Sequence, residues 1–233
     1  VMMPSEFTSR ESLEDAEAVA KTLGIRYDIL PIVDAVSCFE NMLAPMFKGL
    51  DSDVTEENLQ ARLRGVLLMA LSNKFGDLLL STGNKSETAV GYSTLYGDMC
   101  GGYAPINDIY KTDAYALARW RNAHHPRWIK NEVRKIMPDR LITKAPTAEL
   151  RPNQKDEDSL PPYKTLDAIL KHFIENDEGV DEVVAAGFDE VVARRVHALL
   201  HRSEFKRAQG APGVKLSRRS FDGDWHYPIT KKV

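Results

Sequence analysis

A polar turn at residues 81–87 is the part of the sequence best suited to chemistry. It reads Ser-Thr-Gly-Asn-Lys-Ser-Glu and follows the apolar run Leu78-Leu79-Leu80, which is typical of a buried strand. Ligands of open α/β sheets bind beyond the carboxyl ends of the strands, where this turn would lie. Asn84 and Glu87 also have the spacing of a helix capping box, and the pattern alone favours that structural role over ligand binding.

A glycine-rich stretch at residues 97–108 is a second candidate, for phosphate binding. Its glycines would let backbone amides approach a phosphate, and Lys111 just beyond it would add a positive charge. The pair Lys111-Thr112 lacks the spacing of the GxxxxGKS/T phosphate loop, however. From the pattern alone, an ordinary flexible loop leading into a helix is favoured.

Asn58 and Arg62 are four residues apart in a segment, 56–74, that is expected to be one long helix. That spacing puts both side chains on one helix face, where together they could hold a carboxylate or a phosphate. Most such pairs are solvated surface, and the spacing by itself favours that alternative.

Two further patterns favour structural roles. His197 and His201 are four residues apart, but Ala198 occupies the position where the HExxH zinc motif needs glutamate, so a metal site there is disfavoured. The C-terminal region is basic with few aromatic residues between the charges, which favours a solvated face over a nucleic-acid site. Its basic residues are Lys206, Arg207, Lys215, Arg218 and Arg219.

Alternating strand and helix patterns are expected to position these groups. Residues 1–4 and 27–32 have strand patterns, and residues 12–23 between them carry apolar side chains at helical spacing. A strand, helix, strand order favours a parallel sheet with a right-handed crossover. Further helices are expected at 112–122, 166–175 and 181–205, and the charged segment 151–162 is expected to be an exposed, mobile loop able to act as a lid.

Composition narrows the class of protein. The chain has 233 residues and a formal net charge of -3, which favours one α/β domain acting on a small molecule over a nucleic-acid or membrane-binding protein. Cys38 and Cys100 are too few and too far apart for a disulfide framework, so we expect the reducing cytoplasm. The sequence has neither an apolar run long enough to span a membrane nor a signal-peptide pattern.

The order of motifs along the chain resembles the NAD synthetases. The resemblance rests on 81–87, on Gly-Tyr-Ser-Thr-Leu-Tyr-Gly-Asp at 91–98 and on Lys-Ala-Pro-Thr-Ala-Glu-Leu at 144–150. Pro105-Ile106, Lys111-Thr112 and Ala-Pro-Gly-Val-Lys at 211–215 continue it, so it covers essentially the whole chain. It implies an α/β fold in which a parallel sheet has helices on both faces. The implied fold is of the adenine nucleotide alpha hydrolase-like (ATP pyrophosphatase) type. The resemblance also implies that residues 1–233 form one domain.

The resemblance also implies a reaction. ATP adenylates the nicotinate carboxylate of deamido-NAD with release of pyrophosphate, and ammonia then displaces AMP to give NAD. ATP and Mg²⁺ are the implied cofactors, and a homodimer or larger assembly is the implied state. Gly-Gly-Tyr-Ala at 101–104 and the motif at 211–215 resemble the glutamine-dependent branch, in which an amidase domain supplies the ammonia.

Site residues are assigned by position from the resemblance. Thr82, Lys111 and Thr147 are expected to contact ATP, the first at the adenosine and the other two at the phosphates. Glu87 is expected to bind Mg²⁺ or to lie against deamido-NAD. The remaining dinucleotide contacts are expected from Asn58, Arg62, Tyr92, Ser93, Thr94, Leu95 and Lys206, although some ammonia-using members carry Lys in place of Leu95.

One family motif is absent from the sequence. NAD synthetases grip pyrophosphate with an SGGxDS loop between the first strand and the first helix, and no such segment occurs in residues 1–233. We therefore expect an N-terminally incomplete domain, without that strand, loop and helix, and no NAD formation by this chain alone. Two alternatives stay open. One is another ligase of this fold, such as a GMP synthetase or a tRNA-thiolating enzyme, and the other is an inactive module that only binds the dinucleotide.

Overall fold

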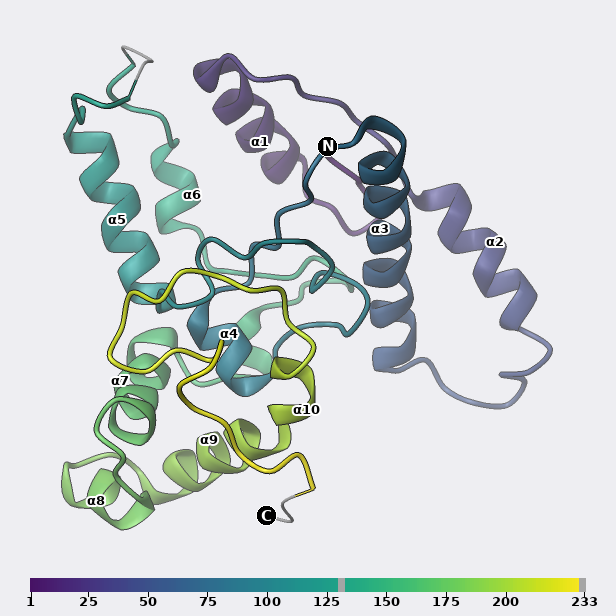
Figure 1. Ribbon diagram of the computed structural model, residues 1–233. Coiled ribbons are helices and arrows are strands. Elements are labelled where there is room, and N and C mark those ends of the chain that lie inside the picture. Colours follow the sequence, from purple (N-terminus) through teal and green to yellow (C-terminus); the bar gives the residue numbers. More distant parts are fainter. Residues whose placement is uncertain (130–132, 231–233) are drawn as a thin grey trace. The chain divides into compact units, whose positions relative to one another are not determined.

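The computed structural model describes residues 1–129 and 133–230 (Figure 1). The chain forms two compact units. One consists of Val1–Arg64 with Tyr115–Ser159, and the other of Gly65–Ala114 with the chain from Leu160 onward. Each unit therefore combines segments that are far apart in the sequence.

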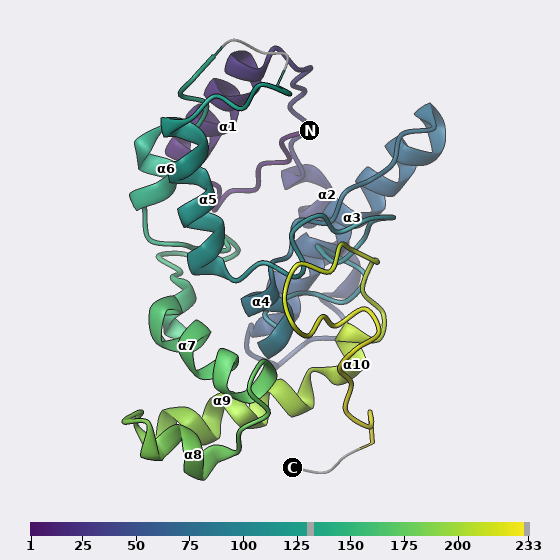
Figure 2. The same ribbon diagram turned by 60° about the vertical axis from the view of Figure 1, so that its left-hand side comes forward.

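The first unit is helical. It contains α1 (Arg10–Leu23), α2 (Val33–Leu43), α6 (Asp139–Thr143), the short 3-10 helix η1 (Asp156–Asp158), and parts of α3 (Val54–Phe75) and α5 (Lys111–Ala123). The Ser9 side chain caps the start of α1 by accepting the Ser12 amide, and Gly24 ends the helix in a left-handed conformation with φ 66°. Arg140 of α6 contacts Asp15 of α1 at 2.8 Å, and the two helices lie close together in Figure 2.

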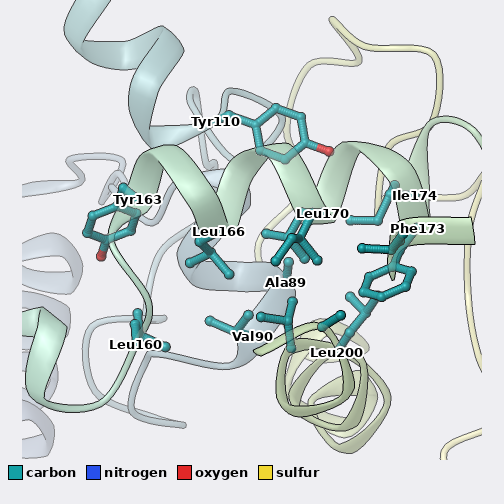
Figure 3. Close-up of a cluster of buried hydrophobic side chains, with 14 of the residues drawn as sticks. Ala89, Val90, Tyr110, Leu160, Tyr163, Leu166, Leu170, Phe173, Ile174 and Leu200 are labelled. Atoms are coloured by element: carbon teal, nitrogen blue, oxygen red, sulfur yellow. The ribbon is translucent and has the colours of Figure 1, made fainter. Parts of the chain in front are cut away.

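The second unit contains the C-terminal part of α3 with α4 (Lys85–Val90), α7 (Tyr163–Ile174), α8 (Val180–Ala185), α9 (Glu190–Arg202) and α10 (Glu204–Arg207). Apolar residues repeat at helical spacing along α7, and Leu166 and Leu170 are fully buried. They pack with Ala89 of α4 and Leu200 of α9 in one core (Figure 3). Burial of a leucine side chain contributes about 1.5–3 kcal/mol, so this core fixes α4, the helix that follows the candidate turn.

The expected parallel sheet is present only as isolated pairings. The described residues form three parallel bridges, Met2↔Ile29, Leu80↔Tyr103 and Ala104↔Gly213, and no longer strand. The first bridge joins the segments 1–4 and 27–32, with the Met2 amide donating to the Asp28 carbonyl at 2.7 Å. Since α1 lies between these segments in the chain, the predicted strand, helix, strand order is present in outline.

The prediction of a buried strand at 78–80 is wrong. Leu78 is 66% exposed and Leu80 is 49% exposed, although Leu80 does pair with Tyr103. An apolar run becomes buried only where other elements cover both faces of its strand, and a local pattern carries no information about that cover.

Two other segments differ from their predictions. The segment 181–205 is three helices, because Gly187 (φ 98°) interrupts it after α8 and Ser203 separates α9 from α10. The segment 151–162 is exposed in part, but Asp156 and Leu160 are 4% and 5% exposed. Its action as a lid stays a prediction. Within the described residues, we find no helix with the length and apolar character of a membrane span.

Candidate functional site

A pocket of about 130 Å³ opens in the second unit beside the start of α4. Its lining includes five of the residues that sequence analysis assigned to ligands: Thr82, Glu87, Tyr92, Ser93 and Lys206. Other lining residues had no assigned role, among them Asp98, Asn107, Phe221 and Asp222. Whole ligand sites usually enclose about 300–1,000 Å³, so this pocket has room for one group of a larger ligand.

Glu87 both caps a helix and forms an ion pair. Its amide donates to Asn84 Oδ1 at 3.1 Å and its Oε2 accepts the Asn84 amide at 3.3 Å, which completes the predicted capping box. Its other oxygen, Oε1, lies 2.7 Å from Lys111 Nζ. Both carboxylate oxygens of Glu87 thus have partners within the chain, Oε2 in the capping box and Oε1 at Lys111.

Asp167 on α7 ties together the starts of α4 and α5. Ser86 Oγ donates to one of its oxygens, and the Thr112 amide and hydroxyl donate to the other at 2.9 and 2.7 Å. Ser86 Oγ also accepts the Lys111 amide at 2.8 Å. Through these bonds the core helix α7 sets the distance between Glu87 and Lys111.

Lys85, in the polar turn at residues 81–87, is fully buried. Its ammonium lies 2.8 Å from the Asp108 carboxylate and 2.7 Å from Glu175, and it donates to Ser217 Oγ at 2.6 Å. Burial alone would raise the pKa of Asp108, but the Lys85 ammonium and hydrogen bonds from the C-terminal segment hold that pKa below its usual value. Lys85 thus joins the start of α4 to two segments that are distant in sequence.

The segment 211–222 forms one side of the pocket. The Ala104 amide donates to the Pro212 carbonyl at 2.8 Å, and Asn107 Nδ2 donates to an Asp222 oxygen at 3.0 Å. These contacts bring Phe221 and Asp222 into the pocket wall.

The basic C-terminal charges have partners within the chain. Lys215 lies 2.7 Å from Asp224, and Lys206 Nζ donates to the carbonyls of Gly91 and Ser93 at 2.8 and 2.6 Å. Arg219 pairs with Asp177 at 2.9 Å. The expected solvated face is wrong for Arg207, which is 6% exposed, because its guanidinium pairs with Glu204 inside the second unit.

Asp98 has an unusual electrostatic environment. The Thr94 amide donates to its carboxylate at 2.7 Å. Although part of Asp98 faces solvent, the surrounding chain desolvates its carboxylate and raises its pKa, and the Thr94 hydrogen bond only partly offsets this. Thr94 is buried and acts here through its backbone, while Leu95 is half-buried next to it.

Replacing Asp98 with Asn is expected to change how stability depends on pH. A raised pKa means that the folded protein favours the protonated carboxyl, so stability falls as pH rises from the ordinary value of 3.8 through the raised value. Asn can still accept the Thr94 amide but does not ionise. Denaturant unfolding from acidic to neutral pH should show a smaller loss of stability in Asp98→Asn than in the parent, and equal slopes would contradict the assignment.

Asn58, Arg62 and Thr147 belong to the first unit. Gln60, between the first two on α3, donates to the Leu150 carbonyl at 3.0 Å, which joins α3 to the segment that carries Thr147. That contact joins α3 to the 144–150 segment within this unit, while Gln60 lies on a different face of α3 from Asn58 and Arg62. The other predicted residues, including Lys111, lie in the second unit.

The histidine pair has structural contacts. The Nε2 atoms of His197 and His201 are 3.0 Å apart, and the His201 ring stacks on Tyr227 with 3.7 Å between centroids. Across residues 1–129 and 133–230, no three or more His, Cys, Asp or Glu side chains are grouped so as to hold a metal ion.

Comparisons with known proteins agree with the motifs around the pocket. The family model described as NAD synthase matches residues 1–210. The chain belongs to the NAD synthase family. It is 53% identical over 232 residues to a glutamine-dependent NAD(+) synthetase of Rhodobacter capsulatus, covering 100% of this chain and 42% of that protein.

Two solved structures of family members have a fold similar to that of this chain. The structure of glutamine-dependent NAD+ synthetase from Acinetobacter baumannii in complex with adenosine diphosphate is 46% identical, with a TM-score of 0.58 over 98% of this chain and 39% of that one. A glutamine-dependent NAD(+) synthetase from Cytophaga hutchinsonii, 21% identical, has a TM-score of 0.79 over 98% of this chain and 38% of that one. The chain thus spans about two fifths of the length of these relatives.

Five residues that hold the pocket of this NAD synthase family member together had no role assigned from the sequence, although Asp98 and Asp108 lie in the glycine-rich stretch 97–108. They are Lys85, Asp98, Asp108, Asp167 and Asp222. Lys85 and Asp98 stand inside the two motifs that carry the resemblance, which was a signal that could have singled them out. Asp108, Asp167 and Asp222 carry no such local signal, because their partners are distant in the chain.

Proposed function

We propose that this chain is part of an enzyme that catalyses the ATP-dependent amidation of deamido-NAD to NAD, through an adenylated intermediate and with release of AMP and pyrophosphate. The observation that carries the proposal is that Lys206, although distant in sequence, lines one pocket together with Thr82, Glu87, Tyr92 and Ser93. The 53% identity to a glutamine-dependent NAD(+) synthetase supports it. We assign residues 1–233 to one ATP pyrophosphatase-type domain of this family.

Adenylation is needed because a free carboxylate is a poor electrophile. The step requires positive charge at the phosphates and close placement of the carboxylate and the α-phosphorus. Lys111 supplies charge beside the pocket, and we assign it and Thr147 to the phosphates and Thr82 to the adenosine. Support for a nucleotide comes from the related Acinetobacter baumannii enzyme, which was solved with adenosine diphosphate. The Lys111 ammonium has three N–H donors, so it can bind a phosphate while one donor stays with Glu87 at 2.7 Å.

Glu87 is the candidate ligand for Mg²⁺. Proteins usually hold this ion through one or two carboxylates together with substrate phosphates, so the Glu87 carboxylate fits an ion that arrives with the nucleotide. When bound, such an ion neutralises phosphate charge. The capping bond through Oε2 keeps the Glu87 side chain oriented and leaves Oε1 on the Lys111 side.

Tyr92, Ser93 and Lys206 are assigned with Glu87 to deamido-NAD. Lys206 holds the carbonyls of Gly91 and Ser93 at 2.8 and 2.6 Å, and so shapes the turn that lines the pocket. We assign the nicotinate end of the ligand to the part of the pocket that Tyr92, Ser93 and Lys206 line. Asn58, Arg62, Thr94 and Leu95 are assigned to the remainder of the dinucleotide.

We infer the remaining partners from the relatives. Their names indicate that glutamine is the source of ammonia, which an amidase domain would supply. We propose a homodimer or larger assembly in the cytoplasm, with no nucleic-acid or membrane partner.

The test compares this chain with a version extended upstream through an SGGxDS loop. Each is given ATP, Mg²⁺, ammonia and either deamido-NAD or XMP, NAD and AMP are measured, and binding of deamido-NAD is titrated separately. The 233-residue chain is expected to form no NAD. Turnover of deamido-NAD but not XMP by the extended version is the expected result. Turnover of XMP would indicate another ligase of this fold. Binding of deamido-NAD without ATP consumption by both versions would indicate a dinucleotide-binding module.

A further inference from the structure

Residues 144–150 of the first unit form a closed arch with Thr147 in its middle. Lys144 Nζ and Glu149 Oε1 lie 3.3 Å apart and join the two ends of the arch. Within it, the Glu149 amide donates to Thr147 Oγ1 at 3.2 Å. This bond uses a lone pair of the oxygen, which leaves the hydroxyl proton for donation to an anion.

Glu149 has an unfavourable backbone conformation. Its φ is 52°, in the left-handed region that non-glycine residues seldom adopt. Such a conformation costs of order 1–3 kcal/mol and persists only where the surrounding structure imposes it. The contacts of this residue must therefore offset that cost.

The Glu149 carboxylate is bound to the start of α1. It accepts the Ser9 amide at 3.1 Å and the hydroxyls of Ser9 and Ser12 at 2.7 Å each. Ser9 is the N-cap of this 14-residue helix, where negative charge is favourable. Burial would raise the pKa of Glu149, but these hydrogen bonds and Lys144 hold it below its usual value, so the group is ionised at neutral pH.

The arch is also fixed on its other sides. Gln60 of α3 donates to the Leu150 carbonyl at 3.0 Å, and the Asp156 amide donates to the Pro146 carbonyl at 3.1 Å. Gln60 is 3% exposed, so this anchor is buried. Other segments therefore hold the arch at Pro146 and Leu150, and the corner at Glu149 lies between these two anchors.

We propose that Glu149 is a positioning residue for nucleotide binding: its carboxylate, bound to the start of α1, holds the left-handed corner that orients the Thr147 hydroxyl toward a phosphate. The proposal rests on the phosphate role assigned to Thr147 under the proposed function. Glu149 itself touches no substrate in this scheme. Its effect should thus appear in the affinity for ATP and not in the affinity for deamido-NAD.

The Glu149→Gly substitution distinguishes the role of the Glu149 carboxylate from the role of its backbone conformation. Glycine adopts a φ of 52° without strain, so a purely conformational role predicts an unchanged or more stable arch. Our proposal predicts the opposite, namely ATP affinity weakened about 10-fold, as for loss of one well-placed hydrogen bond. Glu149→Gln, whose amide oxygen can still accept the serine hydroxyls, should recover part of that loss. Glu157→Ala removes an exposed carboxylate of a neighbouring segment and should change neither affinity.

Calorimetric titration of ATP and deamido-NAD into the 233-residue chain, with amide exchange at residues 144–150, distinguishes the outcomes. Faster exchange in Glu149→Gly together with a loss confined to ATP supports the proposal. Unchanged exchange, or equal losses for both ligands, overturns it. Thr147→Val tests the assigned phosphate role separately: if that variant binds ATP normally, the role of Thr147 fails, and with it the phosphate part of this proposal. The exchange data would still decide whether Glu149 holds the arch.

Discussion

Glu87→Gln is expected to lose about 10²- to 10³-fold in turnover, the size of effect seen when one preorganised charge-stabilising group is removed. The measurement is NAD formation by the version extended through the SGGxDS loop, at saturating ATP and deamido-NAD. Glutamine keeps the capping box, because its amide oxygen can accept the Asn84 amide as the Glu87 oxygen does at 3.3 Å. It removes the negative charge that lies 2.7 Å from Lys111 and that would hold Mg²⁺.

Asn84→Ala is the matched control, because it removes the other half of the same capping box. Loss of an N-cap side chain costs about 1 kcal/mol of stability, so this variant should melt earlier but keep turnover near that of the parent. The opposite pattern, with Glu87→Gln fully active and only less stable, would show that Glu87 is a helix cap and no more. Comparison of the two variants therefore distinguishes the effect of the capping box with Asn84 from the effect of the Glu87 charge beside Lys111.

Lys85→Met is expected to have the largest effect on stability. Breaking a buried ion pair by removing one partner costs about 3–5 kcal/mol, because the other charge is left buried without compensation. Asp108 and Glu175 would both lose the ammonium that lies 2.8 and 2.7 Å away, and the Asp108 side chain is 1% exposed. Methionine has similar volume, so the effect should come from charge and not from a cavity.

The control for Lys85 is a surface lysine with a single carboxylate partner. Lys21 pairs with Glu17 at 2.6 Å with its side chain 74% exposed, and Lys21→Met should change stability by no more than about 1 kcal/mol. Urea unfolding of both variants gives the comparison. A change in Lys85→Met as small as that in Lys21→Met would contradict the central role of this cation. Adding Asp108→Asn to Lys85→Met should recover part of the loss, since one buried charge is then removed.

Local features of the site could be predicted from the sequence. The capping box of Asn84 and Glu87 depends on bonds between residues three apart, and its spacing is visible in the chain. The helix predicted at 56–74 is α3, Val54–Phe75, because helical periodicity is a property of consecutive residues. The order of motifs also indicated the family, since similar chemistry requires the same residues at the same relative positions.

Other features depended on tertiary structure, because they arise between residues far apart in the chain. Lys85 contacts Glu175 and the C-terminal Ser217, and no local spacing in the sequence indicates these contacts. Through them, this buried lysine connects three segments of the chain. Leu78 is exposed because burial depends on what covers a segment, which its own pattern cannot show. The raised pKa of Asp98 likewise comes from desolvation by surrounding segments. Short-range hydrogen bonds can thus be predicted from the sequence. Burial and charge pairing cannot, because they depend on contacts between segments that are distant in the chain.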